Sequence, residues 1–456
     1  MENTSSERIA AIAAAQKQWF RDSDRHDIKS RKESLRKLKS AILKWQKDLE
    51  EALWTDLHKS PEEALLTETS IVLGEIDNHL RHIDSWASGH CRRTPLKMFP
   101  SRSRVMSEPL GNALIISPWN YPVQLLLNPL VGALSAGCTA MLKPSPYVPH
   151  VSSVIEQMIS ETFPESQVAV VQGNREVNAQ LLSLKWDIIF FTGSPALGRT
   201  VMEAAAKNLT PVVLELGGKS PCIVDRDADL ETAAKRIAWG KALNAGQTCI
   251  APDYLLVHKN VKAEFLTLLA GKFTELLGEN PKASRHFVRI VNDRAFERLK
   301  SYLDCGKIVS GGHTDASERY FEPTILDNVS PDSAVMQEEI FGPVFPVIDF
   351  ETADEAVDFI NARPKPLALY YFGKSGRKIL SRTTSGGACI NDTIMHIANE
   401  NLPFGGVGNS GMSSYHGKES FDVFSHYRAV VSTTTKLDLP FRYMPYRLFG
   451  LTKKLL

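Results

Sequence analysis

Apolar residues recur at alternating steps of three and four along the first part of the chain. Between residues 34 and 53 they form one stripe, and this spacing predicts a single amphipathic helix. A second helix is expected to begin at Pro61, where Ser60 supplies an N-cap and Glu63 the returning carboxylate of a capping box. Gly89 is the expected stop of this helix. The stripe of the first helix consists of Leu35, Leu38, Ile42, Trp45, Leu49 and Ala52.

From Arg104 onward the pattern changes to short β-branched or aliphatic runs separated by helix-length amphipathic segments. Buried strands that alternate with helices indicate βαβ units and a parallel sheet covered on both faces. The first series of predicted strands covers residues 113–117, 140–143, 168–171, 188–191, 212–216 and 222–225. After a helix predicted from Leu230, with Asp229 as its N-cap, a second series covers residues 254–258, 346–350, 367–372 and 388–391. The chain is therefore expected to adopt an α/β fold with two α/β units.

Residues 123–142 carry no charged side chain and have the length of a membrane span. Gln124, Asn128, Pro129 and Gly137 interrupt this run, so we expect a buried helix followed by a buried strand. The N-terminus has neither a basic start nor a continuous apolar core, so no secretory signal and a cytoplasmic location are predicted.

The C-terminal tail, residues 441–456, carries aromatic and basic residues. Packing on the protein itself or on a partner subunit is favoured there over weak contact with a membrane surface.

The chain has 456 residues, of which 43% are hydrophobic, enough to bury the cores of two or three domains. Lysine and arginine together number 53 against 52 acidic residues, so no net field attracts nucleic acid or an anionic membrane. A small-molecule substrate is favoured for this reason. The six cysteines are widely spaced without a CxxC pair, which argues against a disulfide framework and against a metal site.

Four short segments carry candidate chemistry. They are Ser-Pro-Trp-Asn-Tyr-Pro at residues 117–122, Glu-Leu-Gly-Gly-Lys-Ser-Pro at 215–221, Gly-Gln-Thr-Cys at 246–249 and Glu-Glu-Ile-Phe-Gly-Pro at 338–343. In this order they resemble the aldehyde dehydrogenase superfamily, and the resemblance extends over residues 108–428. Leu-Pro-Phe-Gly-Gly-Val-Gly-Asn-Ser-Gly at 402–411 and Tyr-His-Gly-Lys at 415–418 resemble its class 3, fatty-aldehyde branch in particular.

The resemblance implies an aldehyde-dehydrogenase-like α/β fold and a homodimer. A Rossmann-like NAD(P)-binding domain with N-terminal helices is expected in residues 1–82 and 108–212, and an α/β catalytic domain in residues 213–400. A small β oligomerisation arm is expected from residues 83–107 together with 401–440. The implied activity is the NAD(P)-dependent oxidation of medium- to long-chain aliphatic or aromatic aldehydes to carboxylic acids.

Oxidising an aldehyde by hydride transfer requires its carbonyl carbon to become tetrahedral first, and a thiolate can add to it. Cys249 follows a turn at Gly246 that can leave its sulfur exposed, and by similarity it is the nucleophile that forms the thiohemiacetal and then the thioester. A single cysteine is more often a small buried hydrophobe, an interpretation that suits Cys138, Cys222 and Cys389.

The addition generates an oxyanion that needs hydrogen-bond donors in a site poor in water. The Asn120 amide is the candidate donor, with the Cys249 backbone N–H as its partner by family resemblance, although an asparagine before Pro122 also suits a plain turn. Glu215, at the end of an apolar strand, suits a general base that activates water for thioester hydrolysis, because desolvation raises the pKa of such a carboxyl. The alternative for Glu215 is a solvated strand-end charge.

The segment Gly-Ser-Pro-Ala-Leu-Gly contains the cofactor-binding candidates Gly193, Ser194 and Gly198. It departs from the usual dinucleotide fingerprint, because four residues separate its glycines and a third glycine is missing. It follows a predicted strand and opens a helix, so backbone N–H groups and the helix dipole can face a pyrophosphate.

The resemblance assigns four further residues to the NAD(P) site. Lys143 is expected to bind the adenosine ribose and Glu339 the nicotinamide ribose, while Trp119 and Phe341 belong to the same site and Phe341 packs beside the ring. Many family members have a glutamate three residues after the lysine, where this chain has Pro146. The anion that would repel a 2′-phosphate is missing, which predicts that NADP is accepted alongside NAD.

Two alternatives to hydrolytic aldehyde oxidation stay open. A CoA-acylating dehydrogenase passes the thioester to coenzyme A, and Glu215 counts against it because thiol transfer needs no water-activating base. A catalytically silent relative would keep the fold for a structural or binding role, and the presence of all the expected site residues counts against it.

Overall fold

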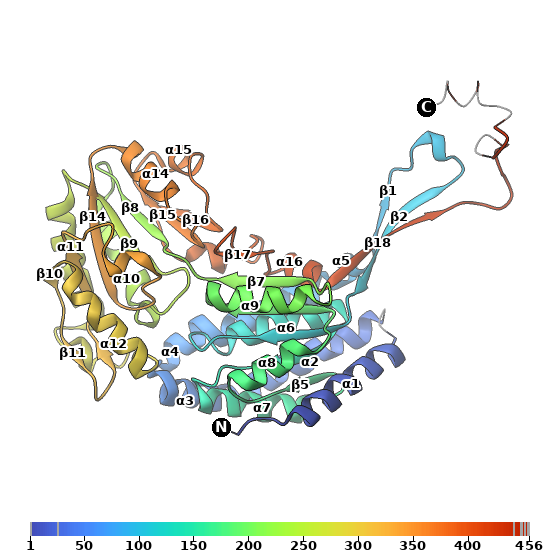
Figure 1. Cartoon of the computed structure of the whole chain (residues 1–456), viewed down its shortest axis with the longest axis horizontal. Coiled ribbons are helices and arrows are strands. Elements are labelled where there is room, and N and C mark those ends of the chain that lie inside the picture. The colour runs from blue at the N-terminus through green and yellow to red at the C-terminus, as the bar shows by residue number, and fades with distance from the viewer. Residues whose placement is uncertain (1, 25–26, 441–442, 447–449, 451–452, 454–456) are drawn as a thin grey trace.

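The structure, a computed structural model, describes residues 2–24, 27–440, 443–446, 450 and 453. Two α/β bodies lie next to each other, each built on its own sheet, and a slender arm extends away from the first body (Figure 1). The predicted α/β fold class is confirmed. Most of the predicted tail, residues 441–456, lies outside the described residues.

The first body is built on a six-stranded sheet. Its strands are β3 (Asn112–Ile116), β4 (Thr139–Lys143), β5 (Val168–Val170), β6 (Ile188–Gly193), β7 (Val212–Leu216) and β17 (Gly411–Met412). Their order across the sheet is β17-β7-β6-β3-β4-β5. All neighbours are parallel except β17, which runs antiparallel to β7. The strands predicted from the apolar runs up to residue 216 are confirmed.

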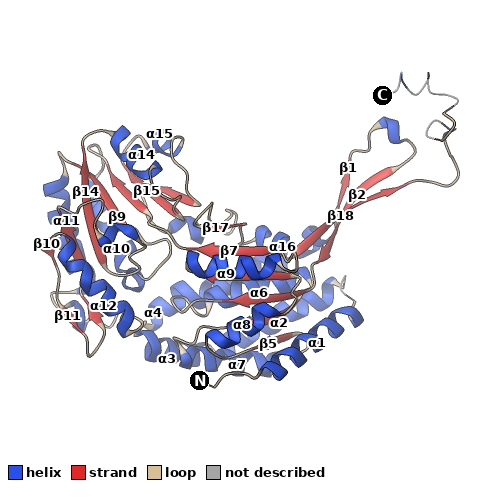
Figure 2. Cartoon of the chain, in the orientation of Figure 1, coloured by secondary structure: helices blue, strands red, loops and turns tan. Residues whose placement is uncertain are grey.

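Alternate residues of each strand face opposite sides of this sheet. On β3, Leu114 and Ile116 pack in one hydrophobic cluster, whereas Ala113 and Ile115 pack in the other. Helices cover both sides, as a parallel sheet requires (Figure 2). One side carries α1 (Ser6–Asp22), α8 (Arg175–Ser183) and α9 (Pro195–Ala206), and the other carries α2 (Ile28–Lys44), α5 (Ser70–Ala87), α6 (Gln124–Ala136) and α7 (Pro149–Thr162).

The uncharged run of residues 123–142 forms α6 and most of β4. Every residue of α6 is buried, and so is every residue of β4. The predicted buried helix followed by a buried strand is confirmed. Within the described part of the chain, none of the helices combines the length and the apolar surface that crossing a bilayer requires.

The single helix predicted for residues 34–53 is wrong. The chain forms α2 and then α3 (Gln46–Leu57), with a bend at Trp45. The bend preserves the helical periodicity, because the Trp45 N–H still donates to the carbonyl of Ala41 and the Trp45 carbonyl accepts from the N–H of Leu49. Both helices therefore bury one continuous stripe, and the apolar spacing does not reveal the bend.

The second predicted helix runs through three segments, α4 (Pro61–Ala64), the π turn η1 (Leu65–Thr69) and α5. Ser60 is its N-cap, and its hydroxyl accepts from the N–H of Glu63 at 3.3 Å. The reciprocal half of the capping box is wrong, because the Glu63 carboxylate accepts from the backbone N–H of Asn244 at 2.9 Å instead. A partner far along the chain replaces the local one.

The second body is built on a seven-stranded sheet. Its strands are β8 (Pro221–Val224), β9 (Tyr254–His258), β10 (Lys307–Ser310), β13 (Thr324–Asp327), β14 (Val344–Phe350), β15 (Ala368–Phe372) and β16 (Gly387–Ile390). Their order is β10-β13-β14-β9-β8-β15-β16, and only β10 is antiparallel to its neighbour. The strand predicted at residues 222–225 belongs to this sheet, and it lies in the segment 213–400 that is expected to form the catalytic domain.

Helices of 4 to 16 residues pack around the second sheet. The helix predicted after Asp229 is confirmed, because the Asp229 carboxylate accepts from the N–H of Thr232 at 2.9 Å. The sheets divide between β7 and β8, a few residues after the expected boundary at residue 212. The helices are α10 (Leu230–Ala242), α11 (Lys262–Leu277), α12 (Asp293–Ser301), α13 (Ala334–Gln337), α14 (Ala353–Asn361) and α15 (Gly376–Leu380), with a small hairpin of β11 (Thr314–Asp315) and β12 (Tyr320–Phe321).

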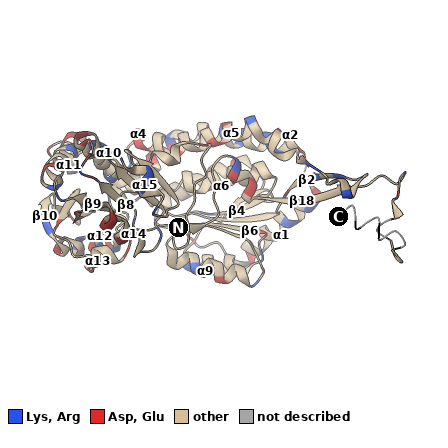
Figure 3. Ribbon diagram, turned by 90° about the horizontal axis from the view of Figure 1, so that it is seen from above, with Lys and Arg blue, Asp and Glu red and all other residues tan. Residues whose placement is uncertain are grey.

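The arm is a three-stranded antiparallel sheet. It consists of β1 (His90–Arg92), β2 (Arg102–Pro109) and β18 (Ser425–Ser432), in the order β1-β2-β18. Of the expected segment 401–440 only β18 belongs to this sheet, because β17 and α16 (Lys418–Val423) lie on the first body. Charges of both signs are spread over the helices of both bodies (Figure 3).

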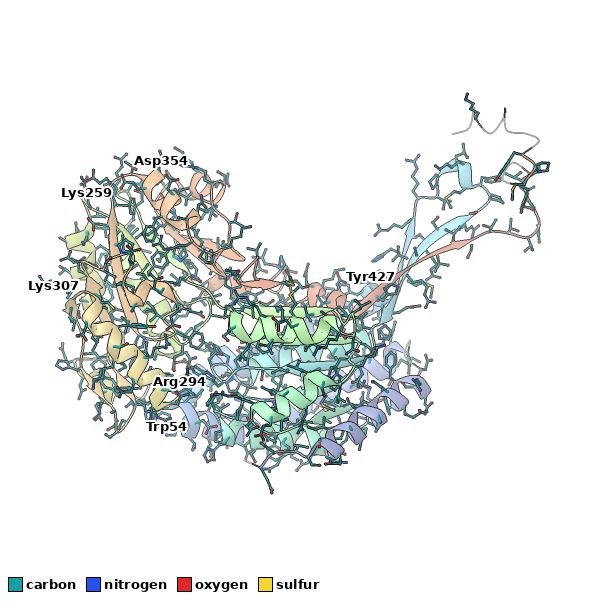
Figure 4. All side chains as sticks on the ribbon, in the orientation of Figure 1. Trp54, Lys259, Arg294, Lys307, Asp354 and Tyr427 are labelled. Carbon is teal, nitrogen blue, oxygen red and sulfur yellow. The ribbon has the colours of Figure 1, made fainter. Side chains whose placement is uncertain are left out.

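The two bodies contact each other directly. The backbone N–H of Arg289 in the second body donates to the carbonyl of Leu57 in the first at 3.0 Å. In Figure 4 the labels of Trp54 and Arg294 lie where the two bodies meet, and the label of Tyr427 lies at the base of the arm.

Candidate active site

One large cavity, with a volume of about 960 Å³, opens at the carboxyl ends of three strands of the first sheet. Pro118 follows β3, Ser194 follows β6 and Gly217 follows β7, and all three line the cavity. Ligands of open parallel sheets bind at such strand ends. The cavity brings together eight of the ten predicted site residues, namely Trp119, Asn120, Gly193, Ser194, Glu215, Cys249, Glu339 and Phe341. Lys143 and Gly198 are not among its lining residues.

Cys249 follows a left-handed turn. Asn244 and Ala245 have φ angles of 50° and 51°, and Gly246 has a φ of 71°. A side chain at Gly246 would place its Cβ 2.4 Å from the carbonyl oxygen of Gly342, so only glycine fits there. The turn leaves Cys249 half-buried in the cavity wall, less exposed than the glycine-containing segment predicts.

The Cys249 thiol lies in a setting that disfavours its ionised form. Desolvation raises its pKa, and the nearby carboxylates of Glu339 and Glu215 raise it further. The thiol is therefore protonated at neutral pH in the protein alone, and a positive charge or a proton acceptor is required before it can act as a nucleophile.

Glu215 is almost completely buried, with 3% of its surface exposed. It lies on β7, opposite Gly411 of β17. Neither of its carboxyl oxygens has a hydrogen-bond partner among the described residues. Desolvation raises its pKa well above the ordinary value, as the position at the end of an apolar strand predicts. The alternative of a solvated strand-end charge is wrong.

Asn120 is buried in the bend that follows β3. Its side-chain amide donates to the carbonyl of Gln247, two residues before Cys249, at 3.0 Å. Its backbone carbonyl accepts from Lys59 Nζ at 3.1 Å and from the Asn244 side chain at 2.9 Å. Asn120 thus joins the β3 loop to the turn that carries the cysteine, which a plain turn-former would not do.

Glu339 lines the cavity and lies on a loop before β14. Burial raises its pKa to about 8, with a further contribution from the charge of Asp253, while the backbone N–H of Gly218 opposes this shift. A Cβ atom at Gly217 would lie 1.9 Å from Glu339 Oε2, so the glycine makes room for the carboxylate. Glu339 Oε1 has no hydrogen-bond partner among the described residues.

An ion network that the sequence did not single out fixes this loop. Arg298 donates to the carbonyls of Glu339 at 3.2 Å and Ile340 at 2.7 Å. The Asp253 carboxylate accepts from the N–H of Ile340 at 2.8 Å and is paired with Lys219. Lys219 lies within the segment 215–221 and Asp253 four residues after the cysteine, but neither spacing indicates that they meet.

Trp119 and Phe341 lie side by side in the cavity wall, with the edge of one ring toward the face of the other. Their ring centroids are 5.4 Å apart, and the rings are nearly perpendicular at 84°. Phe341 adopts a φ of 49°, a left-handed conformation that is unusual for an aromatic residue. Such strain is concentrated at functional sites.

The N-terminus of α9 points into the cavity, because Ser194 is its N-cap and lines the cavity together with Pro195 and Ala196. Gly198 has a packing role instead, since a Cβ there would lie 2.7 Å from Leu216 Cδ2. This glycine lets α9 approach β7 closely.

Lys143 ends β4, the strand beside β3. Its Nζ donates to the carbonyl of Pro144 at 2.7 Å, and burial lowers its pKa to about 8. The side chain therefore folds back on its own strand end in this structure.

Comparison with known proteins assigns this arrangement to a family. A model of the aldehyde dehydrogenase family matches residues 1–430. The chain belongs to that family. The predicted superfamily and the predicted enzyme class, an oxidoreductase acting on aldehydes, are confirmed.

Relatives of this aldehyde dehydrogenase include members of family 3. The chain is 46% identical over 436 residues to 4,4'-diaponeurosporen-aldehyde dehydrogenase of Staphylococcus aureus, covering 94% of this chain and 95% of that protein. It is 47% identical over 384 residues to the human aldehyde dehydrogenase family 3 member B1, covering 84% and 82%. The predicted class 3 branch and the oxidation of aldehydes to acids are thereby confirmed, and neither alternative function is favoured.

Solved structures of aldehyde dehydrogenases have the same fold. A substrate-bound Staphylococcus aureus AldH superposes with a TM-score of 0.96 at 45% identity, covering 98% of this chain and 99% of that chain. A betaine aldehyde dehydrogenase from Staphylococcus aureus in complex with NAD+ superposes with a TM-score of 0.87 at 26% identity, covering 97% and 90%. Use of a nicotinamide dinucleotide follows from the family, whereas the choice between NAD and NADP does not.

Proposed function

We propose that this aldehyde dehydrogenase oxidises medium- to long-chain aliphatic or aromatic aldehydes to carboxylic acids through a thioester on Cys249. The observation that carries the proposal is that one cavity contains a cysteine, a buried carboxyl and a buried amide on three separate segments. The name of the staphylococcal relative refers to 4,4'-diaponeurosporen-aldehyde, and this supports an aldehyde substrate beyond the smallest ones.

The residues that line the cavity fit a dinucleotide. The N-terminal N–H groups of α9 suit a pyrophosphate, and the buried Glu339 carboxylate has an unused oxygen that suits ribose hydroxyls. When bound, NAD or NADP supplies the hydride acceptor and a positively charged ring. We assign Trp119, Gly193, Ser194, Glu339 and Phe341 to this site, with Gly198 supporting it through packing and Lys143 reaching the adenosine ribose after leaving Pro144.

Cys249 adds to the aldehyde in the first step. Its Sγ forms a bond to the carbonyl carbon, the carbonyl electron pair moves to oxygen, and the thiol proton leaves to solvent water. A positive charge near the sulfur lowers the pKa of the thiol and so offsets the effect of burial. The Asn120 amide and the Cys249 backbone N–H donate to the oxyanion, and each such donor contributes about 100- to 1000-fold in rate.

Glu215 acts in the second half of the reaction. After the hydride has left, the carbon is bound to Cys249 as a thioester. Glu215 takes a proton from water, the water oxygen bonds to the carbonyl carbon, and the C–S bond breaks to give the acid and the Cys249 thiolate, which takes up the proton held by Glu215. In its ionised form, a carboxyl whose pKa is raised by burial is a stronger base than an ordinary one.

The test is an absorbance assay for NADH with hexanal and benzaldehyde, with the acid product measured in the absence of coenzyme A. We expect both aldehydes to produce NADH and acid in equal amounts. Absence of any signal with a panel of aldehydes would favour the silent relative. Acid formation that depends on added coenzyme A would favour the acylating enzyme.

The missing anion at Pro146 supports acceptance of NADP alongside NAD. The two values of kcat/KM should lie within a factor of about 1000 of each other, which corresponds to about 4 kcal/mol. A stronger preference for NAD would contradict this part of the proposal.

The homodimer, the cytoplasmic location and the division into domains are part of the same proposal. The arm extends away from the body that carries it, and such a sheet suits contact with a second copy of the chain (Figure 1). Light scattering of the purified protein tests the dimer, and a monomer mass would contradict it.

A further inference from the structure

A pair of oppositely charged side chains lies fully buried behind Asn120. Lys59 and Glu68 both have side chains with 0% exposure, and Lys59 Nζ lies 2.7 Å from Glu68 Oε1. Removing two charges from water is costly, and an apolar pair of similar volume is often as stable. The further contacts of the pair therefore indicate what it holds in place.

Lys59 holds the backbone that carries the Asn120 amide. Its Nζ donates to the carbonyl of Asn120 at 3.1 Å and lies 4.2 Å from the centre of the Tyr121 ring. The same carbonyl accepts from the side chain of Asn244, in the turn before the cysteine, at 2.9 Å. Two donors from two distant segments thus fix the position of one peptide group.

Glu68 holds the other end of the same loop. Its Oε2 accepts from the N–H of Val123 at 3.0 Å and of Gln124 at 2.9 Å. These groups begin α6, whose own N-cap residue supplies no side-chain hydrogen bond, so Glu68 caps the helix in its place. Glu68 lies in the π turn η1, and π turns within helices are frequent at functional sites.

We propose that Lys59 and Glu68 are positioning residues that hold Asn120 where its amide can donate to the oxyanion, an inference that rests on the proposed function. One N–H of this amide donates to the carbonyl of Gln247 at 3.0 Å. The second N–H of the amide group is the one that the oxyanion uses. Catalytic donors must be held within about 0.5 Å of the productive geometry, and the ion pair fixes the peptide group on which this donor is mounted.

The first test is the variant Lys59→Met/Glu68→Gln, which removes both charges and leaves no unpaired ion in the core. Single-turnover formation of NADH reports the steps up to hydride transfer. We expect its rate to fall about 10- to 100-fold, less than the 100- to 1000-fold loss typical of a deleted oxyanion donor. The rate of Cys249 alkylation by iodoacetamide should stay unchanged, because the nucleophile is not altered. A wild-type rate of NADH formation overturns the proposal.

An Asn120→Ala background distinguishes positioning from general structural damage. If the pair acts through Asn120, the double substitution lowers the rate much less in this background than in the wild-type chain. Equal losses in both backgrounds overturn the proposal. A wild-type rate for Asn120→Ala alone contradicts both the oxyanion role of Asn120 and the positioning role of the ion pair. Equal losses in the two backgrounds contradict only the positioning role.

The matched control is Lys262→Met/Asp327→Asn. It removes an ion pair of the second body, with 17% and 18% of the side chains exposed and an N–O distance of 2.6 Å. We expect a lower melting temperature and an unchanged rate of NADH formation, and an equal loss of rate would overturn the proposal. Should the first variant fail to fold, Glu68→Gln alone retains Lys59, and a wild-type rate in that variant also overturns it.

Discussion

The two buried carboxyl groups that line the cavity, Glu215 and Glu339, are held in different ways. Glu215 has no hydrogen-bond partner among the described residues, and burial alone raises its pKa. Glu339 is also buried, but Arg298 and Asp253 fix the loop that carries it, and the Gly218 N–H favours its ionised form. A carboxyl that takes up and releases a proton benefits from having no fixed hydrogen-bond partner, because burial can then raise its pKa. A carboxyl that only accepts hydrogen bonds benefits from a fixed position.

Replacing the nucleophile should have the largest effect on the reaction. We expect Cys249→Ser to lower kcat by about 10⁴-fold or more, a loss typical of a deleted nucleophile. NAD binding, measured by fluorescence titration, should change little because the other cavity residues remain. Turnover that survives this substitution contradicts the thioester mechanism and with it the contrast between Glu215 as a base and Glu339 as a hydrogen-bond acceptor.

Replacing the general base should separate the two halves of the reaction. In Glu215→Gln we expect one rapid equivalent of NADH per site and then steady turnover slowed by about 100- to 10,000-fold, because only hydrolysis of the thioester needs the base. Stopped-flow absorbance measures both phases. A variant that loses the rapid phase as well places Glu215 in the first half of the reaction.

The pH dependence of the wild-type enzyme follows from the same carboxyl. Because burial raises the pKa of Glu215, its protonated form persists at higher pH than that of an ordinary glutamate, and this form cannot accept a proton from water. We expect the hydrolysis step to accelerate as pH rises through the raised pKa. Glu215→Gln should remove this dependence, and an unchanged profile in that variant assigns it to another group.

Replacing the fixed carboxylate should act on cofactor binding. In Glu339→Gln we expect the KM for NAD to rise about 10- to 100-fold, with a smaller change in the KM for aldehyde, because hydrogen bonds from the ribose hydroxyls favour the ionised carboxylate and a loss of this size is typical of hydrogen bonds to a charged group. Glu351→Gln is a suitable control, because Glu351 forms an exposed ion pair with Lys259, which is labelled in Figure 4. An unchanged KM for NAD would show that the loop is fixed for another purpose.

Much of the fold could be predicted from the sequence, because the physical signals are local. Apolar runs on both faces identify the strands of the first sheet, and motif residues such as Asn120 and Cys249 follow predicted strands or helices. The bend at Trp45 could not be predicted, since hydrogen bonding and apolar spacing continue through it. The apolar pattern of residues 222–225 is like that of the strands before it, so this pattern alone does not separate the two sheets, and the strand pairing places these residues in the second one.

The supports of the site could not be predicted, because each depends on a distant partner. Glu63 had the spacing of a local capping box, yet it binds the backbone of Asn244. Lys59 and Glu68 have the sequence pattern of ordinary surface charges beside an amphipathic helix, and nothing in their spacing indicates full burial. Charges that meet only in the folded chain leave no periodic signal.

Two helical glycines, one beside the cavity and one in the second body, differ in the space around them. Gly198 lies where α9 packs on β7, and a Cβ there would meet Leu216 at 2.7 Å. Gly271 lies in α11 with no atom within 4 Å of its Cβ position. We expect Gly198→Ala to lower the free energy of unfolding by about 1–3 kcal/mol through overpacking, and Gly271→Ala to raise it by about 1 kcal/mol through helix propensity. Urea unfolding measures both, and a stabilising Gly198→Ala would show that the helix at the cofactor side can shift without cost.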